Sequence, residues 1–218
     1  MVYYRAMSTS PQNSPATLVK ISVADPSAIG LLGLAIVTLV ASSQKLGLTD
    51  GTALVIPWAV FLGACGQIYA SVSDSKLGNT FGATAFGAYG LFWLGMAMSW
   101  MTQNGVFGET MARGADINQM GLAFVGYLIF TLIMTYGAAG VNKVLFLIFV
   151  MIDFLFIGLS VSVFTLKSAG GLHNAASLFA GVCELVISLL SFYACGAAVL
   201  NAHFGKTVLP TGAALIKK

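Results

Sequence analysis

The sequence predicts an all-α, polytopic membrane protein whose six transmembrane helices form one bundle. Composition indicates the class, because 58% of the 218 residues are apolar and only 8% are charged, too few to cover a soluble domain of this length. Apolar stretches indicate the number of helices, since six of them come close to or exceed the roughly 20 residues that cross a hydrocarbon core. The polar segments between them are too short for a soluble domain.

The predicted spans follow one another at short intervals. In chain order they cover residues 29–46, 53–72, 81–101, 120–136, 144–166 and 177–200. The separator 102–119 is the longest and has room for a short surface helix. We expect residues 1–23 to form a polar cytoplasmic tail without a secretory signal, residues 24–212 the transmembrane domain, and residues 213–218 a C-terminal tail.

The start of the first span favours a helix end that faces a pore mouth. Asp25 is a residue type that caps helices, and Pro26 is tolerated in the first turn. Gly30 and Leu31 follow in the next turn, and small anions bind well at the positive end of such a helix. An ordinary capped helix start explains the same residues, so both interpretations stay open at this point.

The second and third spans carry polar and aromatic residues that suit a cavity. Gln67 in the second span has an amide that is costly in hydrocarbon without a partner or water. A polar, glycine-rich turn then leads into the third span, where Gly82, Phe86, Tyr89 and Trp93 recur at helical spacing and form one stripe. Helix packing with aromatic filler and the lining of an anion-holding cavity both explain this stripe.

The fifth and sixth spans each contain a carboxylate. Asp153 lies near the middle of the fifth span, and Glu184 lies about two turns into the sixth. We expect no Lys or Arg within the spans to pair with them, so each carboxyl group must be protonated or contact water. Proton coupling and a structural hydrogen bond to a neighbouring helix both remain open for these two residues.

Basic residues predict the orientation. An even number of spans places both termini on one side, and seven Lys and Arg then lie on that side against three on the other. The seven are Arg5, Lys20, Lys76, Lys143, Lys206, Lys217 and Lys218, and the three are Lys45, Arg113 and Lys167. Positive charge favours the cytoplasm, so we expect a multi-pass protein of the cell membrane (inner or plasma) with both termini cytoplasmic.

Other classes of function find no support in the sequence. The three cysteines and two histidines lack the spacing of a metal site, and no catalytic or nucleotide-binding motif is present. The net charge of +3 is spread over loops and needs no nucleic acid to explain it. We therefore expect no enzyme activity, no metal, no cofactor and no nucleic-acid partner.

Several sequence blocks resemble one known family. Residues 25–31 (DPSAIGL) are similar to its Asn-Pro-x-Pro-Leu-Gly-Leu signature, with Asp25 at the leading Asn and Ala28 at the second Pro. Residues 66–67 (GQ), 78–90 (GNTFGATAFGAYG) and 201–210 (NAHFGKTVLP) look like its other blocks. Over about residues 24–212 the chain thus resembles the acetate/succinate permease family (AceTr), which includes SatP-like acetate uptake transporters and yeast acetate- and ammonia-exporter relatives.

The resemblance implies a six-helix protomer that assembles as a homo-hexamer, with one pore per protomer. Each pore would carry small monocarboxylates, chiefly acetate and in some members succinate, as an anion channel or a proton-coupled symporter. It also implies a hydrophobic constriction, whose matching positions here are Leu34, Tyr89 and Ile152 (the constriction residues). Tyr89 matches outright, whereas Leu34 stands where the family implies Phe and Ile152 where it implies Leu.

Acetate needs hydrogen-bond donors for its head group and an apolar wall for its methyl group. The candidates for substrate binding are Gln67, Asn79, Thr80, Thr84 and Phe86, and Asp153 is hypothesised to pass a proton in step with the anion. Two other functions explain the same features: a channel for urea or another small neutral solute, and a non-transporting membrane sensor or scaffold.

Overall fold

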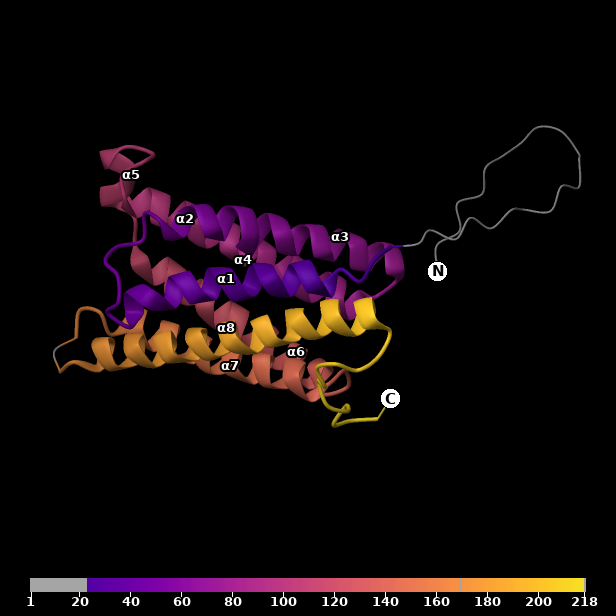
Figure 1. Ribbon diagram of the computed structural model, residues 1–218. Helices are drawn as coiled ribbons and strands as arrows, with labels where there is room; N and C mark the ends of the chain where they lie inside the picture. Colours follow the sequence, from indigo (N-terminus) through magenta and orange to yellow (C-terminus); the bar gives the residue numbers. More distant parts are fainter. Residues whose placement is uncertain (1–22, 169, 218) are drawn as a thin grey trace, which may run out of the picture.

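The computed structural model describes residues 23–168 and 170–217 as a bundle of long helices (Figure 1). Six helical segments are long and apolar enough to cross a membrane: α1 (Ser27–Lys45), α2 (Val55–Trp58) continuing through η1 (Ala59–Gly66) into α3 (Gln67–Leu77), α4 (Thr80–Gln103), α6 (Ile117–Ala138), α7 (Lys143–Phe164) and α8 (Leu172–Phe204). The predicted helical class and all six predicted spans are confirmed. The predicted N-terminal tail lies outside the described residues, apart from its last residue.

Most helices extend beyond the apolar stretches that predict them. The sixth span is predicted over 177–200, but α8 is 33 residues long. The second is predicted to end at residue 72, whereas α3 continues to Leu77 and ends at Gly78, whose φ of 74° suits glycine. A short surface helix, α5 (Glu109–Gly114), occupies the 102–119 separator as expected. Polar residues at a membrane surface thus continue a helix that hydropathy would end.

Side-chain caps define where three spans begin. Asn79 accepts a hydrogen bond from Gly82 N at 3.1 Å before α4, and Asn142 accepts one from Leu145 N at 2.8 Å before α7. Asp116 accepts from the backbone nitrogen of Asn118 at 3.0 Å before α6. Each cap satisfies a backbone donor that the first helical turn leaves free.

The spans surround a common interior. Around the bundle the neighbours are α6, α7, α8, α1, the η1–α3 segment and α4, and the ring closes between α4 and α6, whose backbones approach each other least. Aromatic side chains fill this last seam, where the rings of Phe92 and Tyr127 lie 4.9 Å apart and Tyr127 Oη donates to Ala88 O. α1 begins and α8 ends at one end of the bundle, here named the terminal end; α5 lies at the other, the far end (Figure 1).

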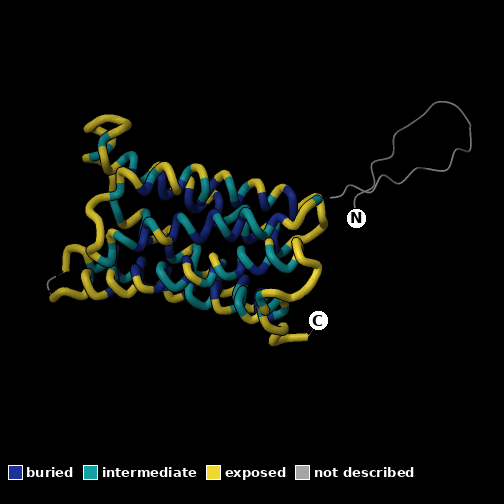
Figure 2. The backbone as a smooth tube through the Cα atoms, viewed as in Figure 1, coloured by how far each residue is buried: buried dark blue, intermediate teal, exposed yellow. Residues whose placement is uncertain are grey.

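Burial follows this arrangement. Buried residues lie along the inner sides of the helices and exposed residues along the outer sides and at both ends (Figure 2). Large apolar side chains also point outward, including Phe61, Leu122 and Ile133, which are 69%, 66% and 67% exposed. An apolar exterior of this kind suits lipid and not water.

The second span contains a π-helical segment, η1, that follows Pro57. There α1 approaches very closely, because a Cβ on Gly33 would overlap the carbonyl oxygen of Leu62. Gln67 is the first residue after the irregular turn and packs with its Cγ against the same glycine. Such π turns often occur at functional sites, and here the turn directs a buried amide toward the interior.

Candidate functional site

A cavity of about 580 Å³ extends from the terminal end into the bundle. Its lining comes from every span except α6, together with the segments just before α1, α4 and α7 and after α8. The lining residues are Asp25, Ser27, Leu31, Leu34, Gln67, Asp74, Asn79, Phe81, Gly82, Ala85, Phe86, Tyr89, Val141, Asn142, Leu145, Ile148, Phe149, Ile152, Ala194, Ala197, Ala198, Asn201, Ala202 and Thr211. Its wall is mostly apolar, with a few polar groups, which is usual for a small-molecule site.

The three constriction residues lie in the lining of this one cavity. Leu34 of α1, Tyr89 of α4 and Ile152 of α7 are 8%, 5% and 3% exposed. The Tyr89 ring is held between other aromatics, with Phe149 at 5.9 Å and Phe130 at 5.8 Å between ring centroids. Its hydroxyl is 2.8 Å from Thr131 Oγ1, which itself donates to Tyr127 O. Because Thr131 uses its only hydrogen there, Tyr89 is the donor, and that hydrogen is not free for a substrate.

Gln67 places a free donor in the cavity. Its side chain is 1% exposed, it lines the cavity, and its Nε2 has no hydrogen-bond partner among the described residues. A buried amide nitrogen without a partner costs about 1–3 kcal/mol, so native proteins usually satisfy it with water or a ligand. Gln67 is therefore the lining residue that points most clearly to an acceptor-bearing ligand.

The N-terminal half of α4 presents one face to the cavity. The predicted candidates Asn79 and Phe86 line it, with Phe81 and Ala85 between them. Thr80 and Thr84 do not line it and are exposed on the outer side of α4, contrary to the expectation that they contribute substrate donors. The reason is helical geometry, since two residues along a helix rotate a side chain by about 200° and away from the Gly82–Phe86 stripe.

Only part of the predicted mouth motif lines the cavity. Asp25 and Leu31 line the cavity, whereas Pro26 and Gly30 are buried behind it. Gly30 lies against the Phe86 ring so closely that a Cβ would overlap it. Asp25 Oδ1 accepts hydrogen bonds from Ser27 N at 2.9 Å and Ser27 Oγ at 2.6 Å, so this carboxylate is turned toward the backbone at the start of α1.

The C-terminal segment bonds to the ends of α6, α7 and α8 at the terminal end and contributes Thr211 to the cavity. Asn201 holds it, because Asn201 Oδ1 accepts from Val208 N and Leu209 N while Nδ2 donates to Leu209 O. Leu215 N donates to Ala139 O at 2.8 Å, so part of the predicted 213–218 tail is bonded to the end of α6.

Asp153 is buried on α7 but does not line the cavity. Its Oδ2 is 2.7 Å from Thr135 Oγ1 of α6, and its Oδ1 has no partner among the described residues. Thr135 belongs to the same face of α6 as Thr131, which contacts Tyr89. Asp153 is thus linked to the Tyr89 hydroxyl through two threonines of α6, Thr135 and Thr131.

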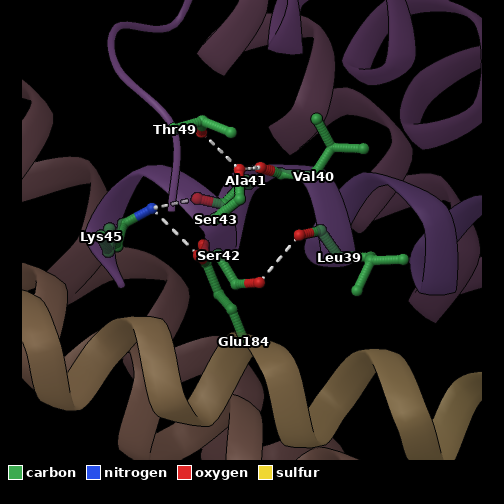
Figure 3. Close-up of polar contacts among 8 residues, drawn as sticks. All are labelled: Leu39, Val40, Ala41, Ser42, Ser43, Lys45, Thr49 and Glu184. Carbon is green, nitrogen blue, oxygen red and sulfur yellow. Dashed lines mark hydrogen bonds and ion pairs between the residues drawn. The ribbon is translucent and has the colours of Figure 1, made fainter. Parts of the chain in front are cut away.

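Glu184 has a cationic partner, so the expectation that it lacks one is wrong. Lys45 Nζ lies 3.0 Å from Glu184 Oε2, and the two side chains are 14% and 4% exposed (Figure 3). Lys45 is the last residue of α1, and its side chain reaches across to α8 at the far end of the bundle. The pair lies outside the cavity lining, so the geometry favours a structural contact over a place in the pathway.

Among the polar lining residues that sequence reasoning missed, Asp74 and Asn201 lie on helices. Asp74 falls in the separator predicted after residue 72, but it lies on α3, is 4% exposed, and accepts a hydrogen bond from Asn79 Nδ2. Asn201 follows the predicted end of the sixth span. Both could have been found by continuing the helical period past the apolar stretches.

Comparison with known proteins gives a consistent result. The sequence model described as the GPR1/FUN34/yaaH family matches residues 7–212. The succinate-acetate/proton symporter SatP of Escherichia coli K12 is 32% identical over 192 residues, which cover 87% of this chain and 96% of that protein. Acetate permease A of Emericella nidulans is 28% identical over 86% of this chain and 65% of its own length.

A solved structure is similar as well. The structure of the bacterial acetate channel SatP superposes with a TM-score of 0.79 at 29% sequence identity, and the match covers 88% of this chain and all of that one. These relatives are named as transporters or a channel, and not as enzymes.

Proposed function

The chain belongs to the GPR1/FUN34/yaaH family, and from that membership we propose that it carries acetate and related small monocarboxylates across a membrane through the cavity. The relatives named above are an acetate and succinate symporter, an acetate permease and an acetate channel. Their shared substrate is acetate, which supports acetate transport for this chain as well.

The proposal depends on Gln67 Nε2, which has no hydrogen-bond partner among the described residues and belongs to the same cavity lining as the constriction residues. A carboxylate oxygen would accept the amide hydrogen, and the methyl group of acetate would contact Leu34 and Ile152. One donor next to an apolar wall fits a small acid with one polar and one apolar end. An apolar wall also sets a desolvation barrier, which favours a weak acid over chloride.

Flux through purified protein tests this proposal. Proteoliposomes should take up labelled acetate, and unlabelled acetate should compete with the label whereas urea should not. Competition by urea would instead favour a channel for small neutral solutes. Absence of flux for every small acid, in protein whose melting curve shows a folded state, would favour a sensor or scaffold. Repeating the uptake with an imposed pH gradient distinguishes a channel from a proton symporter.

We further propose that the terminal end faces the cytoplasm and that six protomers assemble with one cavity each. Among the described residues, four lysines lie near the terminal end (Lys76, Lys143, Lys206 and Lys217). Three basic residues lie at the far end (Lys45, Arg113 and Lys167), so the excess has the sign that the positive-inside rule expects. Arg5, Lys20 and Lys218, which the prediction also counted, lie outside the described residues. Native mass spectrometry would measure the assembly, and protease accessibility in oriented vesicles would measure the orientation.

The constriction residues are expected to set the size limit for substrates. Replacing Leu34 or Ile152 with Ala should raise the uptake of lactate relative to acetate by at least about tenfold, because one methylene in an apolar pocket is worth about 10–200-fold in selectivity. Competition between labelled acetate and unlabelled lactate in proteoliposomes measures the change.

Leu155→Ala is the matched control for this prediction. Leu155 is 4% exposed on the same helix as Ile152, but it does not line the cavity. The Leu155→Ala variant should lose about as much folding stability as the Leu34 and Ile152 variants, since buried Leu→Ala changes cost about 2–5 kcal/mol. Its selectivity between lactate and acetate should stay unchanged. If the Leu34 and Ile152 variants keep the selectivity of the unaltered protein, the size filter lies elsewhere.

Asp153 is proposed to couple a proton to the anion. Thr135 Oγ1 lies within hydrogen-bond distance of both Asp153 Oδ2 and the carbonyl oxygen of Thr131, at 2.7 and 2.9 Å. A hydroxyl has one hydrogen and a carbonyl only accepts, so a protonated Asp153 that donates to Thr135 satisfies both contacts. Such a carboxyl group holds a proton and is linked to Tyr89 through Thr135 and Thr131. It is therefore suited to exchange that proton during transport.

Asp153→Asn should abolish the stimulation of acetate uptake by a pH gradient while uptake itself continues. The asparagine amide keeps a donor toward Thr135 but cannot release a proton, so uptake with and without the gradient should become equal. Asp50→Asn, an isosteric change at an exposed loop residue, should leave the stimulation intact. An Asp153→Asn protein with unchanged rate and unchanged gradient dependence would remove Asp153 from the mechanism.

A further inference from the structure

We infer that Asp25 and Asp74 make the cavity select substrates by charge, so that monocarboxylates pass and the doubly charged succinate is held back. The inference rests on the proposed function, because it concerns which acids enter the same cavity. Asp25 and Asp74 would then be specificity-determining residues of this cavity.

The lining of the cavity carries negative charge without a compensating cation. Asp25 and Asp74 both line it, and no Lys, Arg or His is found among the described lining residues. Lys143 follows the lining residue Asn142 in sequence, but it is exposed and its stem packs against Gly212. Within the described part of the chain, the ion pairs are Lys45–Glu184 and Arg113–Glu109, and neither involves the cavity.

Both carboxylates are held by neutral donors, which orient them without cancelling their charge. Asp25 is exposed at the mouth and bonds the backbone and hydroxyl of Ser27. Asp74 is 4% exposed. Asn79 Nδ2 donates to its Oδ1 at 2.9 Å, and its Oδ2 lies over Gly82 so closely that no Cβ fits there. Both carboxylates belong to the lining that an entering anion meets.

Charge number then decides which acids enter. The repulsion energy doubles for a dianion, so the factor by which a carboxylate lowers the occupancy of a monoanion is squared for a dianion. Succinate also has two head groups, whereas Gln67 Nε2 is the one fully buried amide donor in the described lining that lacks a partner. When one carboxylate of succinate binds Gln67, the second lies in a lining that carries Asp25 and Asp74 and, among the described residues, no Lys, Arg or His.

The test compares three acids in proteoliposomes at neutral pH: acetate, succinate and monomethyl succinate. Monomethyl succinate has the carbon chain of succinate and one charge, so it separates exclusion by charge from exclusion by size. The unaltered protein should take up monomethyl succinate faster than succinate. Asp25→Asn should raise the succinate-to-acetate ratio by about threefold to tenfold, the range expected for one unit charge several ångströms away near water. Asp74→Asn should act in the same direction.

Asparagine caps a helix as well as aspartate does, so Asp25→Asn should fold normally. Asp116→Asn is the matched control, because Asp116 caps α6 at the far end and does not line the cavity; its succinate-to-acetate ratio should stay unchanged. If the unaltered protein takes up no acetate, the proposed function fails and this inference fails with it. If acetate is taken up but Asp25→Asn and Asp74→Asn leave the ratio unchanged, only the inference fails. Equal exclusion of succinate and its monomethyl ester would identify size as the filter and overturn it.

Discussion

Replacing Gln67 with Leu is expected to lower acetate uptake by about tenfold to a hundredfold while the protein remains at least as stable. Hydrogen bonds to charged groups contribute about 1.5–3 kcal/mol, which corresponds to that range of rates when the bond to the carboxylate is lost. The stability change has the opposite sign, because Gln67 Nε2 is buried without a partner among the described residues, and a leucine of similar size removes that cost. Initial uptake rates in proteoliposomes and melting temperatures in detergent measure the two effects.

The opposite signs are what make this prediction specific. A residue that only supports the fold would lose stability and transport together. Gln67→Glu provides a second variant of the same size, in which a carboxylate replaces the amide donor and should repel acetate. Ser191→Ala is the control, since Ser191 Oγ is also buried without a partner among the described residues but lies outside the cavity lining. Uptake by Gln67→Leu at the rate of the unaltered protein would place the anion-binding donor elsewhere.

The helical period of the third span was predictable from the sequence. Applying it to every candidate on that span would have given a more accurate prediction of the lining residues. Gly82, Phe86 and Tyr89 of the predicted stripe line the cavity, whereas Trp93 does not and packs against Gly63. Thr80 and Thr84 were predicted to bind substrate because their hydroxyl groups can donate hydrogen bonds. The same helical period, however, turns them to the opposite side of α4. Asp74 was missed because hydropathy reports where apolar residues stop, whereas backbone hydrogen bonds decide where a helix stops.

Contacts between helices were not predictable in the same way. Lys45 and Glu184 are separated by 139 residues, and nothing in either segment says that α1 packs beside α8 in the register that brings them together. That register depends on small residues, since a Cβ on Gly181 would approach Lys45 Cβ to 2.8 Å. The sequence therefore suggested an unpaired Glu184, and the fold supplies the partner.

Breaking the Lys45–Glu184 pair is expected to have the largest effect on stability. Glu184→Leu should destabilise the protein by about 3–5 kcal/mol, because it leaves the largely buried Lys45 ammonium without its counter-ion. Lys45→Met together with Glu184→Leu should recover most of that loss, since two apolar residues can replace a buried ion pair with little change or a gain. Melting temperatures of both single variants and the double variant give the coupling energy.

An exposed pair in the same protein provides the control. Arg113 and Glu109 lie 3.6 Å apart with side chains 82% and 79% exposed, so Glu109→Leu should cost no more than about 1 kcal/mol. A similar loss in the Glu184→Leu and Glu109→Leu variants would mean that the Lys45–Glu184 pair is exposed to water in the working protein.

The double variant also decides the role of Glu184 in transport. Around the pair, α1 and α8 are joined directly, for Ser188 Oγ of α8 donates to Ala35 O of α1 at 2.7 Å, which leaves no space between them for a substrate. If the pair only joins these helices, the double variant should take up acetate with normal stimulation by a pH gradient. A folded double variant that has lost the stimulation would instead assign the coupled proton to Glu184, and Asp153→Asn would then keep its gradient dependence.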